Sequence, residues 1–444
     1  MPSAPVGNLS GLTPQNQDVF CSINHLPKEL LIEIFLTVYD CAGDDGWDML
    51  LPEVTISHVS KLWHLRYNQS AIYLERSKEA PLQILIDFKA DEGAAETSDV
   101  IESLNTLDAI MTQIIPHISH WYGLHIIVSD YSMAHRAFIR MGACISAPML
   151  EMLQIANYPR KGVGENERQE FRRHDFILFH GHAPKLSTST FGCHAKDVRP
   201  SFKDFARILC NSPELERLSL CKSGPADLWF SGHGVHPAIP LPSLRELEFV
   251  YSKSMHMNHL IERLALPNLA SLSIRAVTKY HDASGTALLE TLTRPSPATG
   301  RSVLSKLREL KLTAVECSEP AVVAGMFAEL TELRSLSLHQ IIFMPWENVL
   351  IAQWESIARS NEVPLLPRLE MLTTTCLSGE FARKLIKARK ATRTPFKKVF
   401  ISRPSDFTKK DKQWIQDHVD TFGYYRGSYG EVIMETEGVN GMIS

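Results

Sequence analysis

The sequence predicts an α/β fold in which a small N-terminal helical module precedes a long, irregular solenoid of strand–helix repeats. Three observations support this prediction. A leucine pattern recurs from about residue 100 onward, amphipathic stretches lie between its copies, and two further helical patterns come before them. The 444 residues are enough for one long repeat array together with a small domain.

Composition limits the class of protein. The chain has 46 Lys and Arg against 50 Asp and Glu, with 44% hydrophobic and 22% charged residues, which is typical of a folded soluble protein. A net charge of -4 argues against a protein whose whole surface binds nucleic acid. The chain shows neither a signal peptide nor a long apolar run, so we expect no membrane contact and a cytoplasmic or nuclear location. The 8 cysteines form no C-x-x-C pair and are expected to be reduced thiols.

The N-terminal region contains two helical patterns and one strand pattern. Residues 1–22 are polar and proline-containing, which predicts a flexible leader. The segment INHLPKELLIEIFLTVYD follows and places apolar residues on one helical face, and Pro27 suits its first turn. A second helix is expected over 53–66, where Ile56, Val59 and Trp63 recur at helical spacing. Alternation of apolar residues in LQILIDF predicts a strand over 82–88.

The repeated unit is L-x-x-L-x-L, and its copies start 25 to 38 residues apart. The six clear copies are Leu150/Leu153/Ile155, Leu215/Leu218/Leu220, Leu244/Leu247/Phe249, Leu269/Leu272/Ile274, Leu307/Leu310/Leu312 and Leu333/Leu336/Leu338. The three weaker copies are Trp121/Leu124/Ile126, Leu186/Ser189/Phe191 and Leu369/Leu372/Thr374. The repeat leucines are expected to form the core.

Amphipathic stretches such as FKDFARILCNS, MNHLIERLAL, AVVAGMFAEL and FARKLIKARKA separate the copies. A strand followed by a helix, repeated along the chain, is typical of a leucine-rich-repeat solenoid, in which each unit buries its apolar face against its neighbours. We therefore expect a leucine-rich-repeat-like array over 100–404. A strand at 396–402, a helix at 408–420 and a strand near EVIME lead into a C-terminal cap and tail over 405–444.

The array offers two candidate surfaces for a target protein. Residues between the last two apolar positions of each copy point away from the core by strand alternation and should form a row. These residues are Ser219, Glu248, Ser273, Lys311, Ser337 and Thr373. The alternative, that they are ordinary solvated strand residues, is equally open.

The second candidate surface is basic. Residues 383–412 contain twelve Lys and Arg against two Asp, a net charge of +10. Such a concentration could hold an acidic or phosphorylated segment, and the candidate residues are Arg383, Lys384, Lys387 and Arg389. A solvated helix face is the more common arrangement for a run of charges, and nucleic acid is the least favoured partner.

Signatures of catalysis and cofactor binding are missing from the sequence. It contains no G-x-x-x-x-G-K-[ST], G-x-G-x-x-G, H-E-x-x-H or G-x-S-x-G. His180, His182, Cys193 and His194 lack the paired short spacings of a zinc site. The sequence therefore predicts no catalytic residue, no metal and no cofactor.

Three segments, INHLPKELLIEIF, ISHVSKLWHL and YLERSKEAPLQILID, carry a family resemblance. Over residues 23–88 they resemble the F-box domain of the F-box and leucine-rich-repeat-like proteins of mushroom-forming fungi. The resemblance implies that this module binds a Skp-type adaptor and, through it, a cullin scaffold. The implied adaptor-binding residues are Leu26, Pro27, Leu30, Ile34, Phe35, Val59 and Trp63.

The expected function is that of a non-catalytic substrate-recognition subunit of a cullin-type ubiquitin ligase. The N-terminal module would bind the adaptor and the repeat array would hold an unknown protein target, so that tethering raises the effective concentration of the target. An alternative is a protein-interaction scaffold or sensor built on the same repeats, in which the F-box-like module contributes only packing. An enzyme is the least favoured class, because no catalytic constellation is present.

Overall fold

A computed structural model gives the structure of the protein. The residues that it describes are 58–59, 74–88, 98–157, 177–192, 199–225, 238–251, 254–277, 285–296, 299–339, 346–360, 363–375, 378–402, 407–426 and 433–435. The chain divides into two compact units, Met1–Thr55 and Ile56–Ser444. The predicted leader and first helix belong to the first unit and lie outside the described residues.

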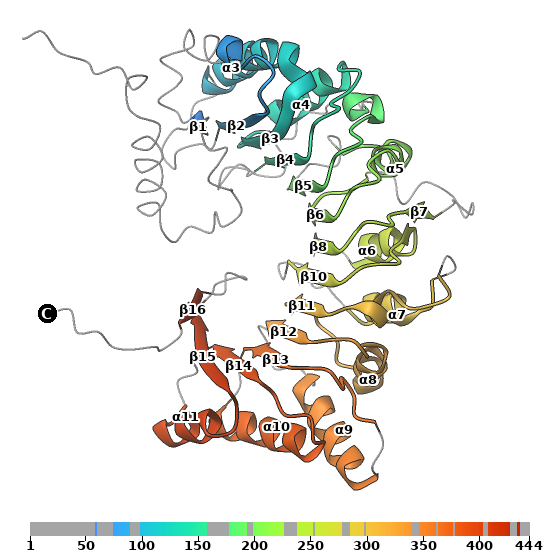
Figure 1. Ribbon diagram of the computed structural model, residues 1–444, viewed down its shortest axis with the longest axis vertical. Helices are drawn as coiled ribbons and strands as arrows, with labels where there is room; N and C mark the ends of the chain where they lie inside the picture. The colour runs from blue at the N-terminus through green and yellow to red at the C-terminus, as the bar shows by residue number, and fades with distance from the viewer. Residues whose placement is uncertain are drawn as a thin grey trace, which may run out of the picture. The chain divides into compact units, whose positions relative to one another are not determined.

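One large sheet dominates the unit Ile56–Ser444, and its strands follow one another in chain order (Figure 1). Every neighbouring pair is parallel except the last, in which β16 runs antiparallel to β15. Its 14 described strands are β1 (His58–Val59), β2 (Leu82–Phe88), β3 (Trp121–Val128), β4 (Met152–Asn157), β5 (Thr188–Gly192), β6 (Arg217–Cys221), β8 (Glu246–Tyr251), β10 (Ser271–Ala276), β11 (Glu309–Thr313), β12 (Ser335–His339), β13 (Met371–Thr374), β14 (Lys398–Ser402), β15 (Thr421–Arg426) and β16 (Ile433–Glu435).

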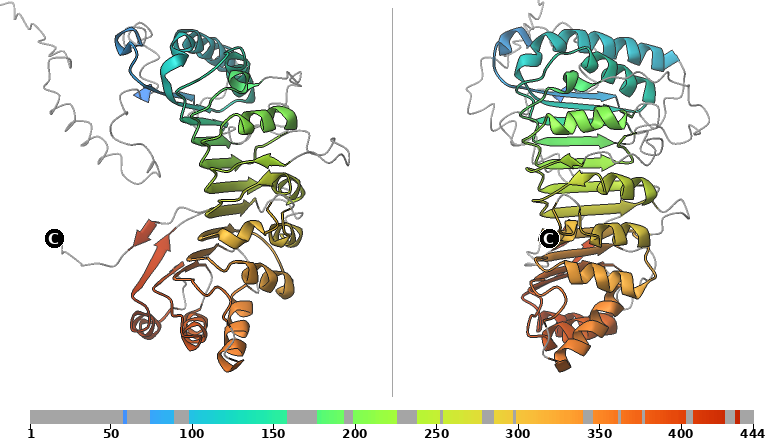
Figure 2. Two further views of the ribbon diagram at one scale, coloured as in Figure 1. Left: turned by 45° about the vertical axis from the view of Figure 1, so that its right-hand side comes forward. Right: turned by 90° about the vertical axis from the view of Figure 1, so that its right-hand side faces the viewer.

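Helices connect the strands and lie on one side of the sheet (Figure 2). They are α3 (Ser98–Ile114), α4 (Tyr131–Gly142), α5 (Phe202–Cys210), α6 (Ser254–Ile261), α7 (Thr286–Thr293), α8 (Pro320–Glu329), α9 (Trp346–Ser360), α10 (Gly379–Ala391) and α11 (Lys409–Gln416). Short 3-10 turns η3 (Ile115–His120), η5 (Leu178–Gly181) and η7 (Val303–Lys306) and a separate parallel pair, β7 (Ile239–Pro240) with β9 (Leu264–Ala265), complete the described elements. Within the described ranges, no helix combines the length and the apolar character needed to cross a membrane.

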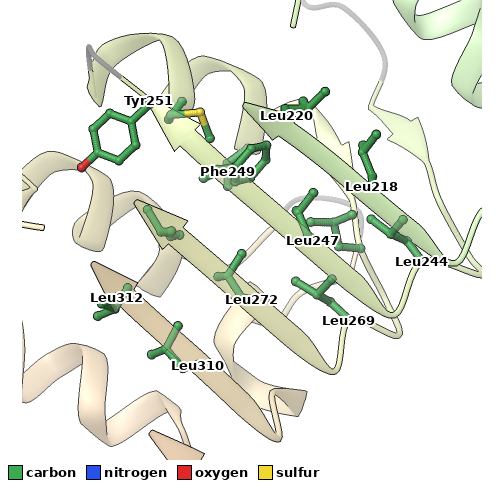
Figure 3. Close-up of a cluster of buried hydrophobic side chains, with 14 of the residues drawn as sticks. Leu218, Leu220, Leu244, Leu247, Phe249, Tyr251, Leu269, Leu272, Leu310 and Leu312 are labelled. Carbon is green, nitrogen blue, oxygen red and sulfur yellow. The ribbon is translucent and has the colours of Figure 1, made fainter. Parts of the chain in front are cut away.

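The predicted α/β fold is confirmed, because each of the nine leucine-pattern copies coincides with a strand of the sheet. The register aligns equivalent positions across strands, so that Leu272 pairs with Leu310, and Leu310 with Leu336. These leucines are at most 2% exposed and pack on the side where the helices lie (Figure 3). Burying a side chain of this size contributes about 1.5–3 kcal/mol, so the stacked rows supply the core that holds the sheet together.

Local sequence fixes the starts of several helices. The Ser201 and Ser378 side chains accept hydrogen bonds from the first-turn amides of α5 and α10. Pro320 occupies the first turn of α8, where its missing N–H costs nothing. Thr408 and Asp411 form a reciprocal capping box at α11. These caps satisfy amides that would otherwise lack partners.

Two sequence expectations differ from the structure. The helix expected over 53–66 is wrong at its two described residues, because His58–Val59 form strand β1 and pair with Leu85 and Ile86. The backbone of β2 would otherwise present unpaired polar groups at the edge of the sheet, and pairing satisfies them. At the other end, β15 extends the parallel sheet beyond β14, although the sequence analysis placed no strand at 421–426.

Candidate functional site

The predicted row of candidate target-binding residues exists. It lies on the strand face, which we define as the face of the large sheet opposite the helices (Figure 2). Strand register places the six residues side by side on six consecutive strands of the sheet, from Ser219 on β6 to Thr373 on β13. Five of them are half-buried. Thr373 is only 4% exposed, beside Phe400 on β14, so the prediction that it lies open to a target is wrong.

Hydrogen bonds already join some polar side chains of this face. Ser219 Oγ donates to Glu248 Oε2 at 2.8 Å, which ties two of the predicted residues to each other. Further toward the N-terminus, His125 Nδ1 on β3 lies 2.9 Å from Gln154 Oε1 on β4. Burial lowers the pKa of His125. These contacts fix side chains in place but bring together no nucleophile with a base.

The next row toward the carboxyl ends of the strands adds Arg275, Thr313 and His339, which the sequence analysis missed. Burial lowers the pKa of Lys311, and the charge of Arg275 acts in the same direction while Glu248 opposes it. Burial and then the charges of Lys311 and Arg275 lower the pKa of His339 to about 4. Three neighbouring strands therefore gather basic side chains on the strand face.

The low pKa of His339 predicts an acid-dependent loss of stability. The folded protein binds a proton at His339 less tightly than the unfolded chain does. The free energy of unfolding is therefore highest above the unfolded pKa of 6.5, and part of it is lost as the pH falls toward 4. Between about pH 7.5 and pH 5, wild type should lose about 2 kcal/mol more unfolding free energy than His339→Gln in urea titrations. His182→Gln, which alters an exposed histidine, is the control and should behave as wild type. Equal losses in all three proteins would contradict this assignment.

The four basic candidates of residues 383–412 differ in exposure, because Lys384 and Lys387 are exposed, Arg383 is half-buried and Arg389 is buried. Arg383 Nε lies 3.1 Å from Asp411 Oδ1, and the Lys387 ammonium lies 5.4 Å from the centre of the Trp414 ring. Hydrogen bonds from Thr408 and the charge of Arg383 hold the pKa of Asp411 below its usual range. Two of the four candidates, Arg383 and Lys387, thus also contact residues of α11.

Arg389 is not a target-binding residue, and that prediction is wrong. Its side chain is 0% exposed and donates hydrogen bonds to the carbonyls of Leu365, Leu366 and Leu369 at 3.3, 2.9 and 3.0 Å. Its guanidinium also lies over the ring of Trp354. Burial lowers its pKa to about 10, so it stays protonated at neutral pH as an internal structural cation.

The residues implied to bind an adaptor are outside the part of the chain whose side chains the structure describes. Leu26, Pro27, Leu30, Ile34, Phe35 and Trp63 are outside the described residues, and Val59 is placed only by its backbone in β1. His180 and His182 lie in and just after η5, whereas Cys193 and His194 are also outside the described ranges. Among described side chains, no group of three or more His, Cys, Asp or Glu could hold a metal ion.

Comparison with known proteins adds no assignment. No protein-family model matches the chain, and no curated protein is significantly similar to it.

Proposed function

We propose that the protein is a non-catalytic substrate-recognition subunit of a cullin-type ubiquitin ligase, located in the cytoplasm, the nucleus or both. An F-box at residues 23–88 binds a Skp-type adaptor, and a leucine-rich-repeat-like array over 100–404 holds the target protein. The array acts by proximity, because tethering raises the effective concentration of target lysines near an enzyme recruited by the cullin.

The continuous strand face is the observation that supports the proposed binding of a target protein. Parallel pairing of β2 through β15 sets equivalent side chains of consecutive repeats next to one another. A row of this kind, with Ser, Glu and Lys side chains at its centre, offers donors, acceptors and charge over several strands. Extended surfaces of stacked repeats are suited to binding a segment of another protein.

The support for adaptor binding is the resemblance of residues 23–88 to an F-box domain. Leu26-Pro27 opens a helical pattern whose apolar face contains Leu30, Ile34 and Phe35, followed by Trp63 and the YLERSK segment. The pairing of β1 with β2 favours the alternative, a scaffold whose N-terminal segment mainly completes the sheet. The two candidates differ in one measurable property, which is association with the adaptor.

The Leu30→Asp/Ile34→Asp double variant should abolish association with the adaptor. Burial of each apolar side chain contributes about 1.5–3 kcal/mol, and a buried carboxylate without a partner adds a further cost. The measurement is pull-down of a Skp-type adaptor by the full-length tagged chain, with folding of each variant checked by circular dichroism.

A matched control places the same substitution on exposed apolar residues of the array. Ile101 is 66% and Val363 is 79% exposed, so Ile101→Asp/Val363→Asp should keep wild-type adaptor capture. A folded Leu30→Asp/Ile34→Asp variant that still captures the adaptor would show that these residues do not bind it. A wild-type chain that captures no adaptor would favour the scaffold.

A further inference from the structure

Exposed lysines gather on α10 and α11, two helices that contact each other at the C-terminal end of the sheet (Figure 1). On α10, Lys384, Lys387 and Lys390 are exposed and follow one another at intervals of about 4.5 Å along the helix axis. Lys409 and Lys410 are exposed in the first turn of α11. We call these five residues the lysine surface.

The lysine surface keeps its positive charge. Among the described residues, no carboxylate forms an ion pair with any of the five lysines. The carboxylate of Asp411, between the two helices, is buried and already paired with Arg383. Glu380 lies in the first turn of α10, and Asp417 follows the last residue of α11. Lysines in the first turn of α11 also oppose the helix dipole, so a bound anion would offset both kinds of repulsion.

Two aromatic rings lie beside these cations. The Trp414 indole stacks on the His418 imidazole with 3.8 Å between ring centres, and the Lys387 ammonium lies 5.4 Å from the centre of the indole. His418 Nδ1 lies 2.7 Å from the Trp414 carbonyl oxygen, which fixes the orientation of the imidazole. Both residues are half-buried. Surfaces that bind single-stranded nucleic acid combine such rings, on which bases stack, with cations that contact the phosphates.

The lysine surface lacks exposed aliphatic side chains. The large apolar side chains that are exposed in the described residues all lie outside α10 and α11, and they are Ile101, Ile145, Met149, Met255 and Val363. Acidic protein partners depend on apolar anchors at the centre of the interface, and a membrane-binding helix inserts apolar residues into the bilayer. A partner that binds through repeated phosphates needs neither. Charge alone made nucleic acid the least favoured partner, whereas the stacked rings and the missing anchors favour it.

We propose that the lysine surface binds single-stranded nucleic acid. Phosphates lie beside Lys384, Lys387 and Lys390, and an unpaired base extends the stack of Trp414 and His418. A single strand fits better than a duplex, because a duplex keeps its bases stacked inside and offers none to these rings. The inference goes beyond the proposed function, since it involves neither the adaptor nor the strand face.

Fluorescence anisotropy of the full-length protein with labelled oligouridine tests the proposal. We expect oligouridine to bind at least tenfold more tightly than a poly-glutamate peptide of the same charge. Lys384→Gln/Lys387→Gln/Lys390→Gln should weaken that binding at least tenfold at low salt. The slope of log affinity against log salt concentration should become shallower by about 2, because three phosphate contacts are lost.

A matched triple variant removes three exposed cations from other parts of the chain. Lys203, Arg301 and Arg308 are exposed, so Lys203→Gln/Arg301→Gln/Arg308→Gln should bind oligouridine as wild type does. Circular dichroism checks the folding of both variants. Equal loss of affinity in the two triple variants would overturn the lysine surface as the binding site.

His418→Ala tests the stacking part of the proposal. At pH 8 it should weaken oligouridine binding several-fold and leave the binding of inorganic polyphosphate unchanged, because polyphosphate has no base to stack. Equal weakening for both ligands would overturn base stacking at His418.

Three further ligands compete with the proposed one. Poly-glutamate that binds as tightly as oligouridine would overturn the proposal in favour of an acidic protein segment. Binding to phosphatidylserine vesicles without binding to oligouridine would overturn it in favour of a membrane. Tighter binding of duplex RNA than of oligouridine would overturn the preference for a single strand. Adaptor capture does not depend on these results, so their failure leaves the proposed function unchanged.

Discussion

Arg389→Ala is expected to lower the free energy of unfolding by about 4 kcal/mol. The side chain is 0% exposed and donates to three backbone carbonyls of the segment before β13. Truncation leaves those buried acceptors without their donor and opens a cavity beside Trp354 and Phe396, whose rings flank the guanidinium. Unsatisfied buried acceptors cost about 1–3 kcal/mol each and a cavity adds to that cost.

The segment that Arg389 holds is itself conformationally costly. Leu366 has φ of 55°, in the left-handed region that non-glycine residues rarely adopt, and its carbonyl accepts from Arg389 at 2.9 Å. Arg389 and the Trp354 indole both donate to Leu365 O, which fixes the turn from two sides. Loss of the guanidinium therefore releases a turn that is held in a strained conformation.

Urea denaturation of the full-length chain measures the effect, with two comparison variants. Lys390→Ala removes the neighbouring exposed cation and should stay within about 0.5 kcal/mol of wild type. Arg389→Lys keeps the charge but cannot present a planar fork, so it should be intermediate. If Arg389→Ala and Lys390→Ala had the same stability, the internal hydrogen bonds would not support the fold.

Hydrophobic periodicity predicted the sheet because each repeat leucine stacks on its equivalent in the next strand. Leu272 pairs with Leu310 in the register of β10 and β11, and both residues hold the same position in their copies of the leucine pattern. The same periodicity does not mark β15, where Thr421–Arg426 contains aromatic and polar residues but lacks the leucine pattern. Strand β1 has only two residues and pairs with the edge of β2, so tertiary context rather than local pattern determines it.

The site was predictable in part. Alternation along each strand predicted the row that runs from Ser219 to Thr373. Two residues further along β10, β11 and β12, the same alternation reaches Arg275, Thr313 and His339. Charge counting misplaced Arg389, because net charge does not show which face of a helix a residue occupies. Helical spacing does show it, since Ala382, Leu385, Ile386 and Arg389 follow the i, i+3, i+4, i+7 pattern of the buried face of α10.

Gly379→Ala is expected to lower the free energy of unfolding by about 3 kcal/mol. A Cβ at Gly379 would lie 2.9 Å from Asp411 Cβ and would also collide with its Cγ and Oδ2. Asp411 cannot easily move, because its carboxylate accepts hydrogen bonds from Thr408 N at 3.0 Å and Thr408 Oγ1 at 2.6 Å. The same carboxylate pairs with Arg383. The added methyl group would therefore overpack the contact between α10 and α11 and break the cap of α11.

Gly325→Ala is the same substitution at another helical glycine, and it is expected to raise the free energy of unfolding. Gly325 lies inside α8, and a Cβ there meets no atom within 4 Å. Alanine in a helix interior is about 0.5–1 kcal/mol more favourable than glycine, so this variant should be more stable than wild type. Thermal and urea denaturation of both variants measure the contrast. A Gly379→Ala protein as stable as Gly325→Ala would show that α11 adjusts without cost and that the close approach at Asp411 does not constrain the fold.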